Sequence, residues 1–550
     1  MRNRRRFASL AAGSLLLLIS ACSSGVGSAA STSAPASSGK PVSGGTVTFG
    51  LEADPENLDP NVAASDEAGL VLRQVVDSLV YENAKHQIEP WLATSWTISN
   101  DSKTYTFTLR QGVTFQDGTP FNAAAVKFNL DRIANPATKS ELAGSLLGPY
   151  KSAAVVSPYV VQVNFSQPYT AFLPLLSEVF MGMDSPTAVQ KEGAAGFASH
   201  PVGTGPYEVV SYTPQSQVVL KRNPHYTWPP AGSAHTGAGY LSQITYRIVP
   251  DDATRVGGVQ SGELTAATTI PPVDVKNLQS NPSLNVSVNA IPGVPYLLAI
   301  NEQHAPWNNQ NARVALRDAL NISPILSALY FGVYQQAWSP LTPSTLDYDS
   351  AVENSWHYDP SMSNQLLDSL GYQRSSPTGY RMFNGKPLTL TYLAEPNSDE
   401  NRLDVAQLMA TQLGKVGIKV NVVEVPSLGS LIADVQKGSY DIAGVDDTEA
   451  DPSVLTDFFD SADQPTPSVF GINWSHLASN SVDGWLNQGS SLTGTARAGA
   501  FNSVQSYTVS AAVAIPVYVP VFIYAYSNTL HGVGYDTSTE YPDFYSAWLS

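Results

Sequence analysis

The chain has 550 residues, of which 43% are hydrophobic and 10% aromatic, and its formal net charge is −17. This length exceeds a single hydrophobic core, so two or three domains are expected, and the apolar content excludes an intrinsically disordered chain. The strong negative charge disfavours binding to nucleic acid or to an anionic membrane surface.

The first residues have the layout of a secretory signal peptide over residues 1–21. Basic residues end at Arg6, an apolar run occupies 15–19, and small residues lead to Cys22, the only cysteine in the chain. One cysteine excludes internal disulfides and cysteine-based metal clusters. The segment 19–22 resembles a bacterial lipobox, which implies that Cys22 is diacylated and becomes the mature N-terminus. A chance cysteine in an ordinary signal peptide is the alternative, and the Sec and twin-arginine export routes both stay open.

A flexible tether rich in Ser, Ala and Gly follows over residues 22–44, and a first strand is predicted at 46–50. Ser65 is expected to cap the first helix. In the next regular stretch, Tyr105, Phe107 and Leu109 alternate with polar residues, which predicts a strand with one buried face. Asn122 is then expected to cap a helix.

The second half of the chain alternates predicted strands and helices, which is typical of an α/β lobe. Strands are predicted at 244–249, 296–301, 388–392, 417–423, 440–445 and 514–519, and helices at 311–320, 403–413 and from 489 through 504.

The residue identities between 91 and 132 carry more information than their periodicity. They run Leu92-Ala93-x-x-Trp96, then Tyr105-x-Phe107-x-Leu109-Arg110-x-Gly112-Val113-x-Phe115-x-Asp117-Gly118-x-Pro120-Phe121-x-Ala123, then Val126-x-Phe128. This series closely resembles the signature of the family 5 extracellular solute-binding proteins, the peptide- and nickel-type receptors of ABC importers. Ala125 and Asp101-Ser102 depart from the usual pattern. Further matches run from about residue 44 to 520.

The resemblance implies an α/β, two-lobed periplasmic-binding-protein-like fold (type II, cluster C) with mixed sheets and a small domain inserted in the first lobe. The expected first lobe comprises residues 45–80, 201–295 and 516–550, the inserted domain 81–200 and the second lobe 296–515. The implied protein is not an enzyme and needs no cofactor or metal. It would be a monomer, anchored outside the cytoplasm by lipid alone, that delivers a solute to ABC permease and ATPase subunits.

An acidic segment is the candidate ligand determinant. The resembled family carries Trp-x-x-Asp-x-x-x-Pro here, and its Asp receives the α-amino group of a peptide. Counting back from Pro452 puts Thr448 at the Asp position, one residue from Asp447. An ammonium in a dry cleft needs a carboxylate, so Asp447 is the first candidate, with a solvated acidic loop as the alternative. The complete set of expected ligand-binding residues is Asp446, Asp447, Thr448, Trp338, Asn61 and Ser65.

The ligand class stays open at this point. Dipeptide-type relatives place an Arg for the ligand carboxylate in the loop 394–400, but this loop has three acids and no basic residue, which disfavours a short ligand with an anionic end. An oligopeptide is the first expectation, and a neutral oligosaccharide, a metal chelate or a signalling role on the same fold are alternatives. A secreted hydrolase has the least support, because no Gly-x-Ser-x-Gly or His-Glu-x-x-His motif is present.

Overall fold

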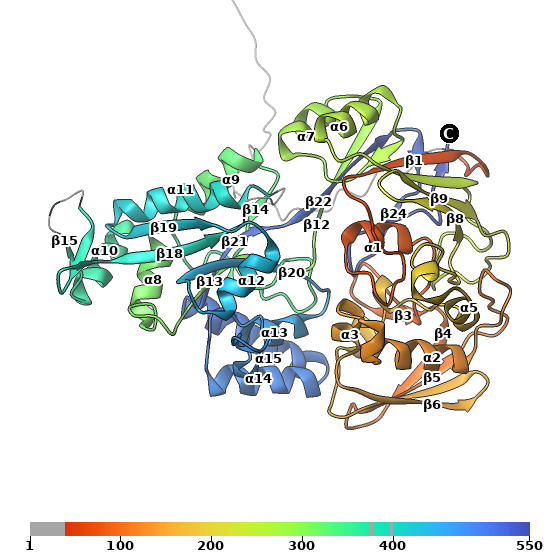
Figure 1. Cartoon of the computed structure of the whole chain (residues 1–550), viewed down its shortest axis with the longest axis horizontal. Coiled ribbons are helices and arrows are strands. Elements are labelled where there is room, and N and C mark those ends of the chain that lie inside the picture. The colour runs from red at the N-terminus through yellow and green to blue at the C-terminus, as the bar shows by residue number, and fades with distance from the viewer. Residues whose placement is uncertain (1–38, 375, 377–378, 396–399) are drawn as a thin grey trace, which may run out of the picture. The chain divides into compact units, whose positions relative to one another are not determined.

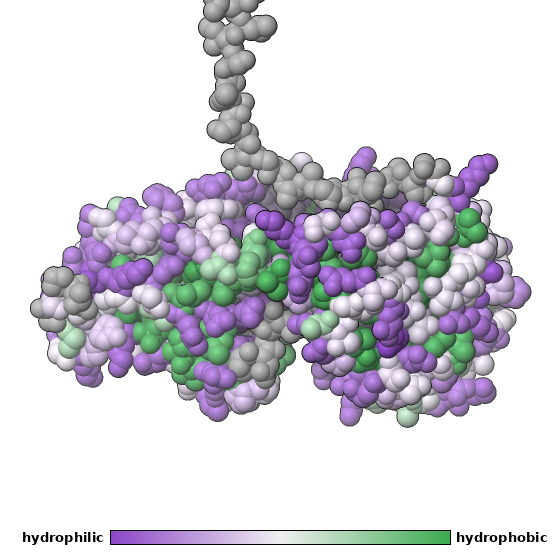
Figure 2. All heavy atoms as spheres, turned by 90° about the horizontal axis from the view of Figure 1, so that it is seen from above, coloured by the Kyte–Doolittle hydropathy of each residue, from purple (hydrophilic) through white to green (hydrophobic). Residues whose placement is uncertain are grey.

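The computed structural model describes residues 39–374, 376, 379–395 and 400–550, and residues 36–550 form one compact unit. Three larger sheets organise it: one of seven strands, one of six and one of four (Figure 1). On the face shown in Figure 2, hydrophilic side chains surround separate patches of hydrophobic residues. These mixed sheets and their helices confirm the expected two-lobed α/β fold. The expected signal peptide and Cys22 lie outside the described residues.

The first lobe is built on the seven-stranded sheet. Its central strand β1 pairs in parallel with β10 and β11, whereas the outer strands are antiparallel. In spatial order the strands are β12 (Leu284–Ala290), β22 (Val521–Ser527), β11 (Ala266–Ala267), β1 (Thr46–Leu51), β10 (Gln243–Ile248), β9 (Gln217–Arg222) and β8 (Tyr207–Thr213). The helices of this lobe are α1 (Asp66–Leu72), α6 (Asp252–Ser261) and α7 (Pro272–Gln279).

The inserted segment forms an antiparallel four-stranded sheet with short helices. As predicted, Asn122 caps α2: its side-chain oxygen accepts hydrogen bonds from the Ala124 and Ala125 N–H groups, at 3.0 and 3.1 Å. The strands are β4 (Ala93–Ile98), β5 (Thr104–Leu109), β7 (Val160–Phe165) and β6 (Tyr150–Ser157), preceded by the hairpin β2 (Val80–Glu82) and β3 (Ile88–Pro90). The helices are α2 (Ala123–Ile133), α3 (Leu142–Leu147), α4 (Phe172–Leu175) and α5 (Pro186–Phe197).

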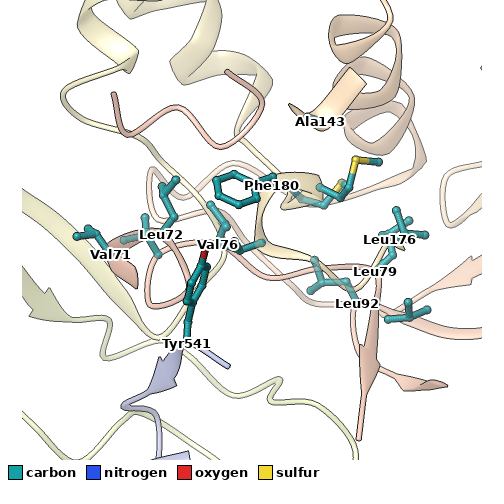
Figure 3. Packing of buried hydrophobic residues seen from close by; sticks show 14 of the residues in the cluster. Val71, Leu72, Val76, Leu79, Leu92, Ala143, Leu176, Phe180 and Tyr541 are labelled. Carbon is teal, nitrogen blue, oxygen red and sulfur yellow. The ribbon is translucent and has the colours of Figure 1, made fainter. Parts of the chain in front are cut away.

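One hydrophobic core joins the first lobe to the inserted domain. Val71 and Leu72 of α1 pack in the same cluster as Phe180 of the inserted segment and Tyr541 near the C-terminus (Figure 3). Glycine makes close approach possible here: a Cβ at Gly69 would lie 2.3 Å from the Tyr541 ring. Near the C-terminus, β23 (Leu530–His531) pairs with β26 (Trp548–Leu549), and β24 (Gly534–Tyr535) pairs with β25 (Pro542–Asp543). These two short pairs complete the first lobe.

The second lobe is built on the six-stranded sheet. Its strands, in spatial order, are β14 (Gln335–Gln336), β21 (Ala514–Val519), β13 (Gly293–Ile300), β20 (Ile442–Thr448), β18 (Thr389–Ala394) and β19 (Lys419–Glu424). Its helices are α8 (Gln310–Asp318), α9 (Ile322–Tyr330), α10 (Pro360–Ser369), α11 (Arg402–Lys415), α12 (Leu428–Gln436), α13 (Leu455–Phe459), α14 (Asn480–Ser491) and α15 (Gly494–Ser510). A small sheet contains β15 (Gln373–Arg374), β16 (Arg381–Phe383) and β17 (Lys386–Pro387). The six-stranded sheet begins at residue 293 and ends at residue 519, slightly beyond the expected limits of the second lobe, 296–515.

Two chain segments pass between the lobes, and a proline stands at each crossing. β12 continues through Pro292 into β13, and β21 continues through Pro520 into β22. Proline has no N–H group and interrupts the strand ladder, so the chain can leave one sheet and enter the other. The Ile291 N–H donates a hydrogen bond to the Pro520 carbonyl at 3.0 Å, which holds the two crossings side by side.

A second contact links the inserted domain to the second lobe. The Thr170 hydroxyl donates to the Gly489 carbonyl at 3.0 Å and accepts from Arg497 Nε at 3.3 Å. Arg497 in turn forms ion pairs with Asp451 at 2.5 Å and Asp347 at 3.4 Å. The lobes are therefore joined by hydrogen bonds as well as by the two crossings.

Two predicted elements differ from the structure. Residues 446–448, with the two acids Asp446 and Asp447, were expected in a loop but form the end of β20, because the strand continues past residue 445 while paired with β13. The helix expected from 489 through 504 is two helices, since Leu492 and Thr493 have extended backbone angles between α14 and α15.

A buried charge network links the first lobe to the inserted domain. Arg132 pairs with Asp59 and, at 3.3 Å, with Asp184, and both acidic side chains are almost fully buried. We expect Arg132→Ala to lower the free energy of unfolding by about 3–5 kcal/mol, because two buried carboxylates lose their counter-ion. Urea unfolding measures this change. The matched control, Arg247→Ala, removes an exposed pair with Glu263 and should cost about 0–1 kcal/mol. Equal effects of the two variants would contradict this account of the network.

Candidate functional site

A cavity of about 640 Å³ lies where the two lobes meet. This volume falls within the range of small-molecule sites. Both crossing segments line it, through Ile291 and Pro520. Its acidic lining residues come from both lobes and are Glu52, Asp66, Asp252, Glu395, Glu400, Asp446 and Asp447, whereas Arg402 is the one basic residue among the described lining side chains. The cavity therefore favours positive charge.

Sheet topology explains why the acidic groups of the second lobe converge. β18 runs parallel to β20, so their carboxyl ends lie at the same edge of the sheet. Glu395, Glu400 and Arg402 follow β18, while Asp446 and Asp447 end β20. Ligands of open α/β sheets bind at the carboxyl ends of the strands, and the cavity occupies that position here.

Arg402 is the site residue that sequence reasoning missed. The loop 394–400 contains no basic residue, but the first residue of α11 places a guanidinium among the acids of this loop. Arg402 Nη2 lies 2.7 Å from Glu400 Oε2 and 2.6 Å from Asp446 Oδ2, and its Nη1 lies 3.5 Å from Glu395 Oε2. The Tyr296 ring lies against the guanidinium, with its centroid 4.7 Å from Cζ. The sequence does contain a signal for Arg402: it follows the predicted strand 388–392, and residues that follow parallel strands gather at one edge of a sheet.

Arg402 does not make the site positive. Among the described residues, three carboxylates face the guanidinium of Arg402, so these groups together keep a negative excess. Burial raises the pKa of Asp446 to about 6, although Arg402 opposes this shift. The Tyr518 hydroxyl donates to Glu400 Oε2 at 2.7 Å, which orients that carboxylate. A ligand carboxylate would have to compete with three carboxylates already in place.

Asp447 differs from its neighbour because successive strand residues face opposite sides of a sheet. Asp446 faces Arg402, whereas among the described residues no basic side chain pairs with Asp447. Burial raises the pKa of Asp447 to about 7, and Asp457 and Asp446 raise it further. Within the part of the chain that the structure describes, the ionised form of the Asp447 carboxyl group therefore has no basic side chain as a counter-ion.

Acidic character extends from the cavity toward the inserted domain. Glu178 is only 3% exposed, and its Oε1 has no hydrogen-bond partner within the part of the chain that the structure describes. Burial raises its pKa well above the ordinary value, with further contributions from Asp536, Glu82 and Asp447. Glu178 of the inserted domain is therefore close enough to Asp447 of the second lobe for their charges to interact.

The other expected ligand residues lie elsewhere. Asn61 is fully buried, and its side chain accepts from Arg132 and donates to the Phe180 carbonyl, so it belongs to the charge network. Ser65 caps α1 by accepting from the Ala68 N–H at 3.2 Å, next to the cavity residue Asp66. Trp338 packs on the core with its ring centroid 5.4 Å from that of Trp356. The structure brings Asp446, Asp447 and Thr448 to the cavity, but neither Asn61 nor Trp338.

The described residues contain neither a metal-binding cluster nor a membrane-spanning helix. No group of three or more His, Cys, Asp or Glu side chains is arranged to hold a metal ion in this part of the chain. Among the helices of the same residues, none has both the length and the apolar character needed to cross a membrane.

The raised pKa of Asp447 predicts a pH-dependent stability difference. The folded protein holds this proton more tightly than the unfolded chain, so ionisation destabilises the fold as pH rises from about 4 through about 7. We expect Asp447→Asn to stabilise the protein by about 4 kcal/mol at about pH 8 and to change little at about pH 4. Denaturant unfolding at several pH values measures this difference. A variant that is less stable than wild type at the higher pH would show that the ionised carboxylate is already well compensated.

Comparisons with known proteins agree with this architecture. The model of the family "Bacterial extracellular solute-binding proteins, family 5 Middle" matches residues 87–466. The chain is 31% identical over 487 residues to the glutathione-binding protein GsiB of Escherichia coli strain K12. This alignment covers 86% of this chain and 89% of that protein. NikA from Brucella suis, solved with Fe(III)-EDTA, superposes with a TM-score of 0.80 at 23% identity, covering 92% of this chain and all of that one. DppA from Helicobacter pylori, solved with the peptide STSA, has a TM-score of 0.72 at 23% identity, covering 92% and 98% of the two chains. The chain belongs to the bacterial extracellular solute-binding proteins of family 5, the solute receptors of ABC importers.

Proposed function

We propose that this protein captures a peptide with a free ammonium group in the cavity between its lobes and delivers it to an ABC permease. The observation that carries the proposal is Asp447, a cavity carboxyl group with no basic partner among the described residues and a pKa raised to about 7. An ammonium group would supply the missing counter-ion, and a charge-assisted hydrogen bond would offset its desolvation.

Charge argues against anionic solutes. Seven acidic side chains of the described residues line the cavity, and the guanidinium of Arg402 already faces three of them. An anionic metal chelate or a ligand with several carboxylates would be repelled by this lining. The peptide-bound relative DppA supports a peptide as the solute, and the glutathione-binding relative supports a peptide-like one.

The two crossings support a mechanism of capture by lobe closure. They join the lobes at two positions, Pro292 and Pro520, and both crossing segments contribute lining residues to the cavity. Rotation about such a hinge is a common way to enclose a ligand. Acidic groups on both lobes would then approach each other, and a cationic ligand between them would lower this repulsion. We infer that the ligand itself favours the closed form.

We also propose a position outside the cytoplasm, with lipid at Cys22 as the anchor. The support is the apolar run at 15–19, the small residues that lead from it to this cysteine, and the Ser-, Ala- and Gly-rich composition of the segment that follows. The family is extracellular, which agrees with export.

The binding proposal is tested with two alanine tetrapeptides that are both amidated at the C-terminus. One has a free N-terminus and the other is N-acetylated, so they differ only in the ammonium group. We expect Asp447→Asn to weaken binding of the free peptide about ten- to a hundredfold in calorimetry, because a charge-assisted hydrogen bond is lost. The acetylated peptide should bind weakly to both proteins.

The matched control is Asp434→Asn, which removes a carboxylate on α12 that pairs with Lys437 outside the cavity. It should leave the affinity for both peptides unchanged. Unchanged affinity of Asp447→Asn for the free peptide would contradict the role of Asp447 and favour a neutral solute.

Membrane attachment is tested separately in a bacterial host. We expect wild-type protein to partition into the detergent phase of a membrane extract and Cys22→Ser to move to the aqueous phase, because acyl chains supply the attachment. A Cys22→Ser protein that still partitions with detergent would contradict lipid anchoring at this residue.

A further inference from the structure

Two large apolar side chains remain exposed in the lining of the cavity. Phe331 is 60% exposed and Val273 is 57% exposed. They belong to different lobes: Val273 lies in the first turn of α7, and Phe331 ends α9 (Figure 1). Other apolar residues in the same lining, such as Ile270 and Ile523, are buried in the core. The exposed pair therefore contributes little to the fold in this state.

Phe331 also has an unusual backbone. Its φ of 55° and ψ of 24° lie in the left-handed region, and Gly332 follows with a φ of 85°. Helices often end with one left-handed residue, but that residue is usually Gly or Asn, because a larger side chain is disfavoured there. An aromatic residue is strained by the left-handed backbone at this position, and most of its ring stays exposed to solvent. The position is thus better explained by a ligand than by folding.

We propose that Phe331 and Val273 form a subsite for a bulky apolar side chain of the captured peptide, and that Phe331 sets this preference. The inference rests on the proposed function of the cavity. The acidic groups of the second lobe would hold the ammonium end, while a neighbouring apolar side chain would cover the exposed Phe331 ring. Burying a large apolar side chain is worth about ten- to a hundredfold in affinity. Because the subsite has one residue on each lobe, an apolar side chain would also hold the lobes together.

The test compares amidated tetrapeptides with a free N-terminus. The parent is the alanine tetrapeptide, and three further peptides each carry one Phe, at the first, second or third position. We expect wild-type protein to bind one Phe peptide at least about tenfold more tightly than the parent in calorimetry. Phe331→Ala should abolish this preference, so that it weakens binding of the preferred Phe peptide about tenfold more than binding of the parent, and Val273→Ala should reduce the preference in part.

Two further variants separate recognition from folding. Phe331→Asn suits the left-handed backbone, so it should keep the melting temperature at or above the wild-type value while losing the preference. Phe470→Ala removes a ring that is 57% exposed but lies outside the cavity lining, and it should keep the preference.

The outcomes distinguish this inference from the function on which it rests. Equal binding of the parent and all Phe peptides by wild type would overturn the apolar subsite and leave peptide capture standing. Equal loss of affinity for every peptide in Phe331→Ala would also overturn it, and would indicate that the ring acts in lobe closure. Binding of no peptide by wild type would overturn the proposed function and the subsite with it.

Discussion

The two antiparallel crossings between the lobes are the constraint on which the rest of the structure depends. β12 and β22 pair in the first sheet, and the same two segments of the chain continue as β13 and β21, which pair in the second sheet. A single two-stranded ribbon therefore belongs to both sheets, with Pro292 and Pro520 at the points where it changes sheet. This ribbon fixes which edge of each lobe faces the cavity, and so it decides which side chains a solute can reach.

The residues at that edge are poorly optimised for the stability of the ligand-free protein. Asp447 keeps a carboxyl group part-buried without a cation, and Phe331 keeps an aromatic ring exposed on a left-handed backbone. Each feature costs folding free energy, and a ligand would recover part of that cost. Strained and unpaired groups of this kind are expected where binding selects residues against folding.

Charge gives the site its chemical character. Within the described lining, Arg402 is surrounded by carboxylates from two different strand ends, so a basic residue in the cavity still leaves the site acidic. The number of acidic and basic residues alone does not show this, because the positions of the charges decide whether a ligand carboxylate can approach. The acids of the first lobe already contact the protein as well: Asp66 accepts from the Tyr541 hydroxyl, and Asp252 pairs with Arg255.

Local sequence patterns determined much of the fold. Alternation predicted β5, the caps at Asn122 and Ser65 were predicted from residue type, and the motif from 92 to 128 indicated the family. The tertiary structure decided the site, because parallel strand ends bring Arg402 and Asp446 together from 44 positions apart, and no local period encodes such a contact. In the folded protein, Asn61 and Trp338 lie outside the cavity lining, because their side chains pack in contacts within the core. The sequence alone determined elements and family, whereas only the packing of distant strand ends determined which charges meet.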